Sequence, residues 1–366
     1  MEVIAKPVFA KLAAEQQMFL QLRKQVNQTV AALEKKRRWL ITLKAILFPS
    51  LYIATYIAAL LYGNNVYILY ACYALLAFFL EINFLNLTHD AVHNTLFNKK
   101  WLNTIYVHFL DLIGANSYIF KIRHIRLHHN YPNVMGWDSD FEQSPLARVF
   151  PHGGYSKMHR YQYIYLPLLY PLYLFNWLFI RDFKDFFKKN TIVWKINTIP
   201  AIEYVKLFFF KALFIFNFII LPKMILHITW GEMITAFLIM MFTASSTSLI
   251  FLLSPHATPE SEFPLPDDKG QLPDTWFRHQ LATTNDVKGN NWFTRFFLGS
   301  FNYHIAHHVF PYVNHVYYPE VTRVIQASAK KNNLPYRIFP LWKSLYNHFL
   351  LLKANAVAEN IFEETM

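Results

Sequence analysis

The sequence is poor in cysteine, glycine and charged residues. Among its 366 residues there is one cysteine, Cys72, and there are nine glycines. One cysteine excludes a disulfide framework, a cysteine-held iron–sulfur cluster and a cysteine-ligated zinc site. So few glycines exclude collagen-like sequence and long flexible linkers. Charged residues make up 16% of the chain, against about 25% in an ordinary soluble domain, so the whole surface cannot face water.

Apolar residues dominate instead. Hydrophobic residues make up 54% of the chain and aromatic residues 18%, and the net charge is +12. A basic and strongly apolar chain is typical of contact with an anionic membrane surface rather than with nucleic acid. The first 40 residues contain no cleavage site after an apolar core, so we expect no cleavable targeting peptide.

Four apolar segments are long enough to cross a bilayer, which takes roughly 20 residues in a helix. They occupy residues 45–62, 66–88, 207–226 and 234–254. Short polar turns, such as Gly63-Asn64-Asn65, join them in pairs and predict two transmembrane hairpins. We therefore expect an all-α integral membrane protein with four transmembrane helices. Residues 1–44 form a cytoplasmic helical segment in this interpretation, and residues 45–366 form one domain.

A fifth apolar segment, residues 161–180, is harder to interpret. Pro167 and Pro171 interrupt it, and basic residues follow directly after it. Lysine and arginine also cluster before residue 45 but are absent from both hairpin turns. The positive-inside rule then places both termini and the sequence between the hairpins in the cytoplasm. A span at 161–180 would put the following basic residues outside, so we predict a re-entrant or interfacial segment, with a true fifth span as the alternative.

The sequence has 16 histidines, and nine of them fall in three clusters and one single position. The clusters are His89 and His93; His124, His128 and His129; and His304, His307 and His308, with His256 standing alone. Residues three or four apart share a helix face and can bind one ion. Adjacent residues point about 100° apart, so a doublet can serve two ions. The pattern predicts a pair of metal ions, and imidazole is compatible with iron, zinc, copper or nickel.

The position of the clusters relative to the predicted spans agrees with one shared site. A helix over residues 66–93 would be about 42 Å long, against a hydrocarbon core of about 30 Å. His89 and His93 would therefore emerge on the cytoplasmic side, and His256 emerges there too. We expect a cytoplasmic helical cap that holds the metals. His279 is the alternative to His256.

The other histidines are expected to be ordinary surface or capping residues. They are His108, His152, His159, His227, His315 and His348.

Several polar residues near the clusters are candidates for supporting roles. Asp90 and Asn133 are expected to orient ligand imidazoles, as hydrogen-bonding neighbours of metal sites do, with ordinary capping as the alternative. Asp138 and Asp140 are expected either to do the same or to form a solvated turn. Glu81 lies inside a predicted span, which makes a functional role the default hypothesis.

Three basic residues beside the second cluster are candidates for binding a lipid or coenzyme phosphate at the surface. These are Lys121, Arg123 and Arg126. The alternative is that their long side chains reach the membrane interface without binding substrate.

The clusters and their surroundings resemble the histidine boxes of the membrane-bound fatty acid desaturases. The neighbouring sequences Gln280-Leu281-Ala282-Thr283-Thr284, Gly299-Ser300-Phe301-Asn302-Tyr303 and Val309-Phe310-Pro311 match as well. The resemblance implies that the box histidines and His256 bind two irons. It also implies that O₂ and two electrons are used to introduce a cis double bond into an acyl-CoA or acyl-lipid.

The resemblance further implies a separate electron donor, either a ferredoxin or cytochrome b5 with its reductase, and a location in the bacterial inner membrane or the endoplasmic reticulum. A hydroxylase or ketolase with the same irons is the nearest alternative. A metal transporter is a remote one, because its ligands should lie along a path through the bilayer.

Overall fold

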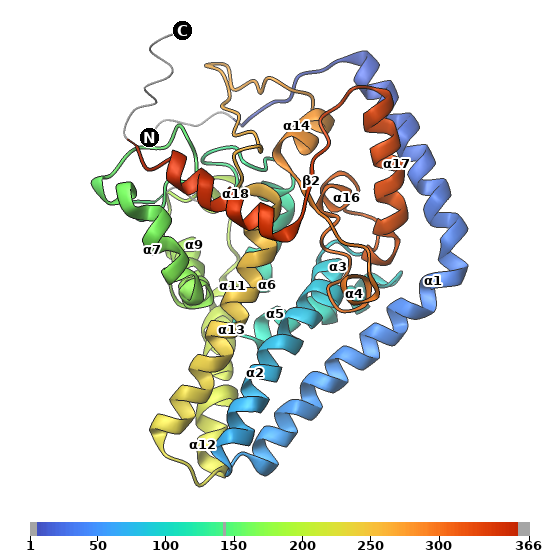
Figure 1. Ribbon diagram of the computed structural model, residues 1–366. Helices are drawn as coiled ribbons and strands as arrows, with labels where there is room; N and C mark the ends of the chain where they lie inside the picture. Colours follow the sequence, from blue (N-terminus) through green and yellow to red (C-terminus); the bar gives the residue numbers. More distant parts are fainter. Residues whose placement is uncertain (1–5, 142–143, 358–366) are drawn as a thin grey trace.

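The chain forms a helical bundle that widens at one end into a cap (Figure 1). The computed structural model describes residues 6–141 and 144–357. The extreme ends of the chain, whose cytoplasmic location was predicted, therefore lie outside the described residues.

Two helical hairpins form the bundle and meet at its narrow end (Figure 1). Their elements are α1 (Ala13–Tyr62), α2 (Val66–Asn83), α11 (Ala201–Ile215), the π-helix η6 (Phe216–Ile220), α12 (Leu221–Ile225) and α13 (Trp230–His256). Asn65 caps α2 by accepting a hydrogen bond from the Tyr67 amide. Thr229 and Glu232 form a capping box that starts α13. Local sequence thus sets both turns of the predicted hairpins.

Helix α1 is continuous, whereas the sequence predicted a boundary at residue 45. Its first half leaves the bundle and packs against α17 (Tyr318–Lys331) (Figure 1). Leu22 and Val26 are fully buried there, and Arg37 forms a salt bridge with Glu320. Tertiary contacts of the basic N-terminal half therefore extend the membrane helix into the cap.

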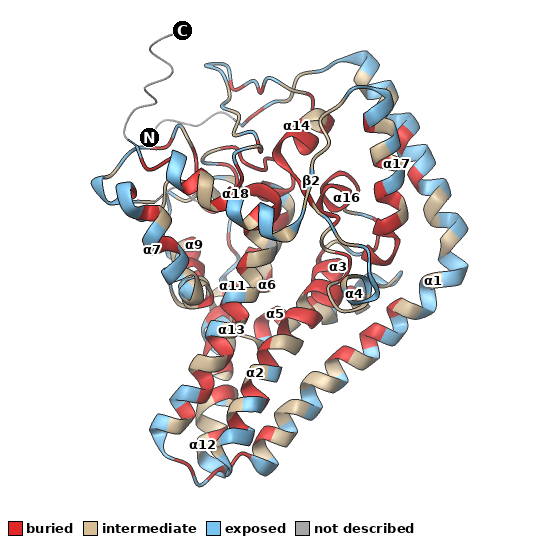
Figure 2. Cartoon of the chain, viewed as in Figure 1, coloured by how far each residue is buried: buried red, intermediate tan, exposed pale blue. Residues whose placement is uncertain are grey.

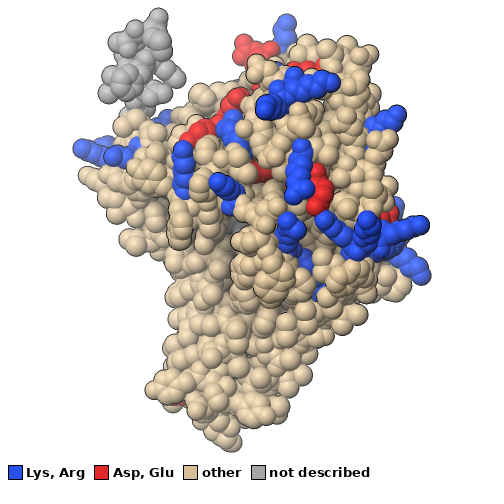
Figure 3. Space-filling view, turned by 45° about the vertical axis from the view of Figure 1, so that its right-hand side comes forward, with Lys and Arg blue, Asp and Glu red and all other residues tan. Residues whose placement is uncertain are grey.

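Within the described residues, five helical stretches are long and apolar enough to cross a membrane by length and composition, one more than the four predicted spans. They are Ala13–Tyr62, Val66–Val92, Lys157–Phe187, Ala201–Ile225 and Trp230–His256. On the face shown in Figure 3, lysine and arginine gather around the cap, and the bundle below it is almost free of charge. This distribution fits a bundle that sits in lipid with its cap in water.

The additional stretch corresponds to the predicted interfacial segment. It consists of η3 (Lys157–Tyr161), α7 (Gln162–Leu169), η4 (Tyr170–Leu172), α8 (Tyr173–Asn176), the π-helix η5 (Trp177–Arg181) and α9 (Asp182–Phe187). Pro167 lies within α7, and Pro171 is the second residue of the 3₁₀-helix η4. Figure 1 shows this segment beside the upper half of the bundle, above the end where the α1–α2 turn and α12 lie.

The cap is built mainly from short helices. Its remaining elements are the π-helix η1 (Phe84–Thr88), α3 (His89–Val92), α4 (Lys100–Val107), α5 (Phe109–Leu112), α6 (Ser117–Lys121), the π-helix η2 (Ile122–His128), α10 (Ile192–Ile196), α14 (Trp276–Thr283), β1 (Asp286–Val287), α15 (Trp292–Phe296), α16 (His304–Val309), η7 (His315–Tyr317), β2 (Ile338–Phe339) and α18 (Leu341–Ala354). Strands β1 and β2 pair in parallel, with Asp286 opposite Ile338. Figure 2 shows α3, α14 and α16 as buried.

Candidate metal centre

Eight of the nine predicted ligand histidines form two groups inside the cap. One group is His89, His93, His124 and His307, and the other is His128, His256, His304 and His308. Within each group, one nitrogen from every ring lies within 4.8 Å of the others. Two nitrogens on one ion lie at most about 4.2 Å apart when each bond is about 2.1 Å. Each group therefore approaches the geometry that one metal ion needs.

The adjacent pair His307 and His308 divides between the two groups, as predicted for a doublet. The spaced pair His124 and His128 also divides, although residues four apart were expected to share an ion. The reason is local backbone geometry. Residues 122–128 form a π-helix, in which the amide of His129 bonds the carbonyl of His124. Widening the turn brings residues five apart, not four, to the same face.

His129 lies between the groups. Its ring centroid is 4.7 Å from that of His93, 4.4 Å from His307 and 4.6 Å from His308. Its Nε2 is 3.2 Å from His124 Nε2. The third cluster brings His304 and His308 together, while His307 turns to the first group.

The rings are suited to bind cations because they are buried and lack other partners. Within the two groups, the Nε2 atoms of His93, His256, His307 and His308 have no hydrogen-bond partner among the described residues. Burial, followed by the neighbouring imidazoles, lowers the pKa of His93, His129, His304, His307 and His308 well below the usual value. These rings are then neutral, which is the form that binds metal. The site therefore fits metal ions.

Carboxylates orient the second cluster. Asp138 Oδ1 lies 3.0 Å from His128 Nδ1, and both side chains are buried. Asp140 lies 3.7 Å from His124 and 3.8 Å from His128. Burial would lower the pKa of His128, but Asp138 and Asp140 outweigh it and raise that pKa to about 9. The sequence allowed these aspartates either to orient imidazoles or to form a solvated turn. In the structure they contact the imidazoles.

Three further contacts to rings of the two histidine groups were not predicted. Gln280 Oε1 lies 3.1 Å from His308 Nδ1, and Tyr318 Oη lies 3.2 Å from His307 Nδ1. The carbonyl of Thr283 lies 3.2 Å from His256 Nδ1. Gln280 and Thr283 belong to the segment Gln280-Leu281-Ala282-Thr283-Thr284, whose match to the desaturase family could have indicated that these residues support the histidines. Nothing local in the sequence marked Tyr318.

Asn133 supports the site through backbone rather than through an imidazole. Its Nδ2 donates to the carbonyls of His256, Glu262 and Thr283, and its own amide donates to Asp138. Its φ is +58°, a left-handed conformation that asparagine tolerates better than most residues. Asn133 thus joins three distant segments beneath His256.

Asp90 contacts residues outside the nine histidines. Its Oδ2 lies 2.6 Å from His315 Nδ1 and accepts a hydrogen bond from Asn314. The other nitrogen of His315 lies 2.9 Å from Lys44 Nζ on α1. His315 and Lys44 are both buried, so the expectation of a surface role for His315 is wrong.

Some of the other single histidines have the expected surface or capping role, and others are buried. His152 and His227 are exposed, and His159 caps η3, as expected. His348 is buried instead and bonds Tyr170 and the carbonyl of Ala257. His279 is buried against Phe9 and belongs to neither histidine group, so His256 is the residue that joins the centre.

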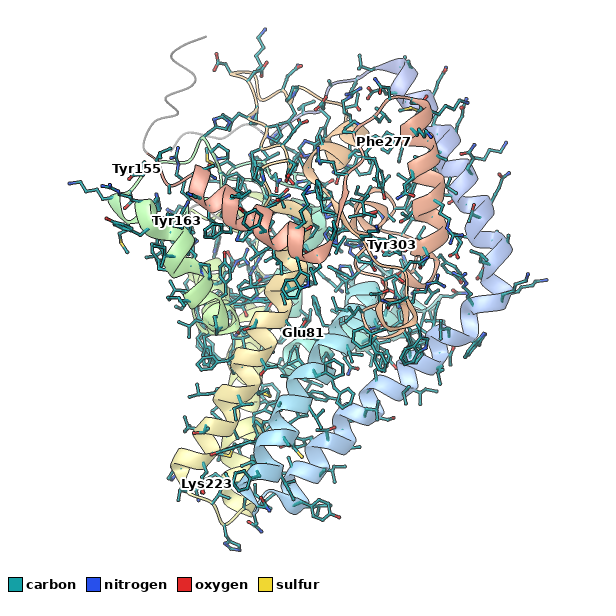
Figure 4. The ribbon with its side chains drawn as sticks, in the orientation of Figure 1. Glu81, Tyr155, Tyr163, Lys223, Phe277 and Tyr303 are labelled. Atoms are coloured by element: carbon teal, nitrogen blue, oxygen red, sulfur yellow. The ribbon has the colours of Figure 1, made fainter. Side chains whose placement is uncertain are left out.

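An apolar pocket connects both histidine groups to the bundle. His89, His124, His128 and His304 line its inner part. Its walls then continue along bundle residues that include Phe214, Met240, Met241 and Ala244. Glu81 also lines it and accepts a hydrogen bond from Ser248. Figure 4 shows Glu81 between α2 and α13 just below the cap, with Lys223 at the far end of the bundle.

The three basic candidates for phosphate binding have different environments. Arg126 is exposed and donates to Asn197 and to the carbonyl of Ile196. Lys121 is half-buried, and burial lowers its pKa. Arg123 is only 2% exposed and lines the pocket. It is therefore not a surface residue, contrary to expectation.

The apolar bundle, the cap and the buried histidines are typical of a helical membrane protein with a histidine site that could hold metal. The fatty acid desaturase family model matches residues 65–340, well over half of the chain. The chain belongs to the fatty acid desaturase family.

Several curated relatives match most of this chain. The chain is 27% identical to the acyl-lipid (8-3)-desaturase of Physcomitrium patens, over 87% of this chain and 66% of the relative. It is 28% identical to the sn-1 linoleoyl-lipid 6-desaturase of Arthrospira platensis, over 69% of this chain and 68% of the relative. The protein of that name from Synechocystis is 27% identical, over 81% and 85%. The chain thus spans slightly less than two thirds of the Physcomitrium protein.

Proposed function

We propose that this chain is a membrane-bound di-iron desaturase that introduces a cis double bond into the acyl chain of a membrane lipid. The reaction uses O₂ and two electrons from a separate donor. The observation that carries the proposal is the pocket, which lies against both histidine groups and continues between apolar residues of the bundle. An acyl chain is the ligand whose shape and polarity fit such walls.

Two irons would be held by His89, His93, His124 and His307 on one side and by His128, His256, His304 and His308 on the other, with His129 between them. Iron supplies the oxidant that unactivated methylenes require, because no side-chain acid or base can remove their hydrogens. The chain's own residues fix the imidazoles through Asp138, Gln280 and Tyr318, and the apolar walls hold the acyl chain and exclude water.

We propose an acyl-lipid rather than an acyl-CoA as substrate, because the three relatives compared above are named acyl-lipid or linoleoyl-lipid desaturases. The electron donor is proposed to be a ferredoxin or cytochrome b5 with its reductase, since the single cysteine of this sequence, Cys72, is buried in α2 and no cysteine-held cluster can form. The cap and its metal centre are proposed to face the cytoplasm.

The test is to express the chain in a host that makes no polyunsaturated fatty acids and to analyse its lipids by gas chromatography and mass spectrometry. Wild type should give a new unsaturated fatty acid, and His307→Ala should abolish it at equal protein level. New hydroxy fatty acids would instead identify a hydroxylase. Metal uptake without any lipid change would identify a transporter. An unchanged product from His307→Ala would contradict the ligand assignment.

A further inference from the structure

Arg123 is a buried cation in the wall of the proposed acyl pocket. It precedes His124 directly, and its guanidinium Cζ lies 5.7 Å from the ring centre of Trp177, another pocket residue. Away from the histidines the wall is mostly apolar, and buried cations in proteins are retained where they have partners or a function. The partners of each nitrogen therefore matter.

One side of the guanidinium is occupied by carboxylates. Arg123 Nη1 lies 3.3 Å from Asp185 Oδ2 and 3.8 Å from Asp182 Oδ1. Asp182 also binds Lys211, with 2.7 Å between Nζ and Oδ2. All four side chains are buried. Two cations thus face two carboxylates, and the charge of Arg123 is already balanced.

The Nε–H of Arg123 has no hydrogen-bond partner within residues 6–141 and 144–357. A buried donor without a partner costs roughly 1–3 kcal/mol, so such groups normally meet an acceptor. The acceptor that a bound acyl chain brings into this apolar pocket is its carbonyl oxygen.

Building on the proposed function, we infer that Arg123 Nε–H donates a hydrogen bond to the ester carbonyl of the bound acyl-lipid and so positions the chain beside His124. The ligand for this donor is a neutral carbonyl rather than a phosphate or a free carboxylate. Asp182 and Asp185 already neutralise the local positive charge, and burying a further anion without a counter-charge is strongly unfavourable. Arg123 is a specificity-determining residue that recognises the ester link.

The test compares two phosphatidylcholines that carry the same chain, ester-linked in one and ether-linked in the other, in membranes that contain the full-length protein and its electron donor. The ether lacks the carbonyl. Wild type should desaturate the ester about 10-fold or more faster, the factor expected for one hydrogen bond to a charged donor. Arg123→Lys, which keeps the charge but lacks Nε–H, should lose most of this preference. Asp268→Asn, on the exposed surface, should keep it.

The possible results separate the two proposals. No desaturation of either lipid by wild type would reject the proposed function itself. Equal rates on both lipids by an active wild type, or an unchanged ester preference in Arg123→Lys, would reject the role of Arg123 alone. If Arg123→Lys does not fold, the charge-balanced double variant Arg123→Met with Asp185→Asn is measured in its place against the same two lipids.

Discussion

His315 Nδ1 and Asp90 Oδ2 lie 2.6 Å apart, and both side chains are buried next to the first histidine cluster. The opposite nitrogen of His315 contacts Lys44 of α1, whose Nζ also donates to Asn86 and to the carbonyl of Arg295. A histidine 225 positions away in sequence thus fixes the turn between His89 and His93 to the long N-terminal helix.

Replacing His315 should therefore destabilise the cap. In His315→Gln, Asp90 and Lys44 lose the ring that joins them, and leaving buried polar groups without a partner costs about 1–3 kcal/mol each. We expect a clearly lower midpoint of thermal unfolding in detergent together with reduced iron content. His227→Gln is the control, because His227 is exposed. Equal midpoints for the two variants would show that the contact contributes little.

Asp138 should support iron binding by holding the His128 ring in place. Asp138→Asn has nearly the same size but no negative charge to hold the His128 ring, so iron affinity and desaturation should fall about 10- to 100-fold, as is usual for such partners of metal-binding histidines. Iron content after titration with a chelator measures the affinity. Asp268→Asn serves as the control on an exposed carboxylate. Unchanged iron retention in Asp138→Asn would contradict this role.

The two histidine groups predict how iron is lost. His307→Ala removes a ligand from one group and His308→Ala removes one from the other, so each variant should retain about one of the two proposed ions. Elemental analysis of purified protein gives the ratio of iron to chain. His279→Gln should retain both ions, because His279 belongs to neither group. Loss of both ions in either alanine variant would indicate a single shared site.

The segment Lys157–Phe187 should not cross the membrane. In a Cys72→Ser background, which has no cysteine, single cysteines are introduced at three exposed positions, Lys24, Tyr67 and Lys188. A membrane-impermeant maleimide should label positions 24 and 188 from the same side and position 67, next to the α1–α2 turn, from the other. Labelling of 188 together with 67 would establish a fifth span.

The local sequence predicted much of the bundle. Apolar length and the turn residues at Gly63–Asn65 identified the hairpins, because a helix in lipid must bury its own backbone polar groups and needs a minimum apolar length. The spacing of the histidines predicted a two-metal site, and the doublet His307 and His308 divides between two groups as expected, whereas His124 and His128 do not share one group. The continuity of α1 across residue 45 was missed, because packing against α17, far along the chain, extends that helix.

Sequence by itself predicted nine histidines as metal ligands and an apolar bundle beside them, because both predictions follow from composition and short-range periodicity. The tertiary structure alone decided how the rings are shared. A π-helix brings His124 to His129 and not to His128. The fold also buries His315 and Arg123, which the sequence predicted to lie at the surface. Such contacts depend on how the helices pack against one another, and a local sequence pattern does not predict that packing.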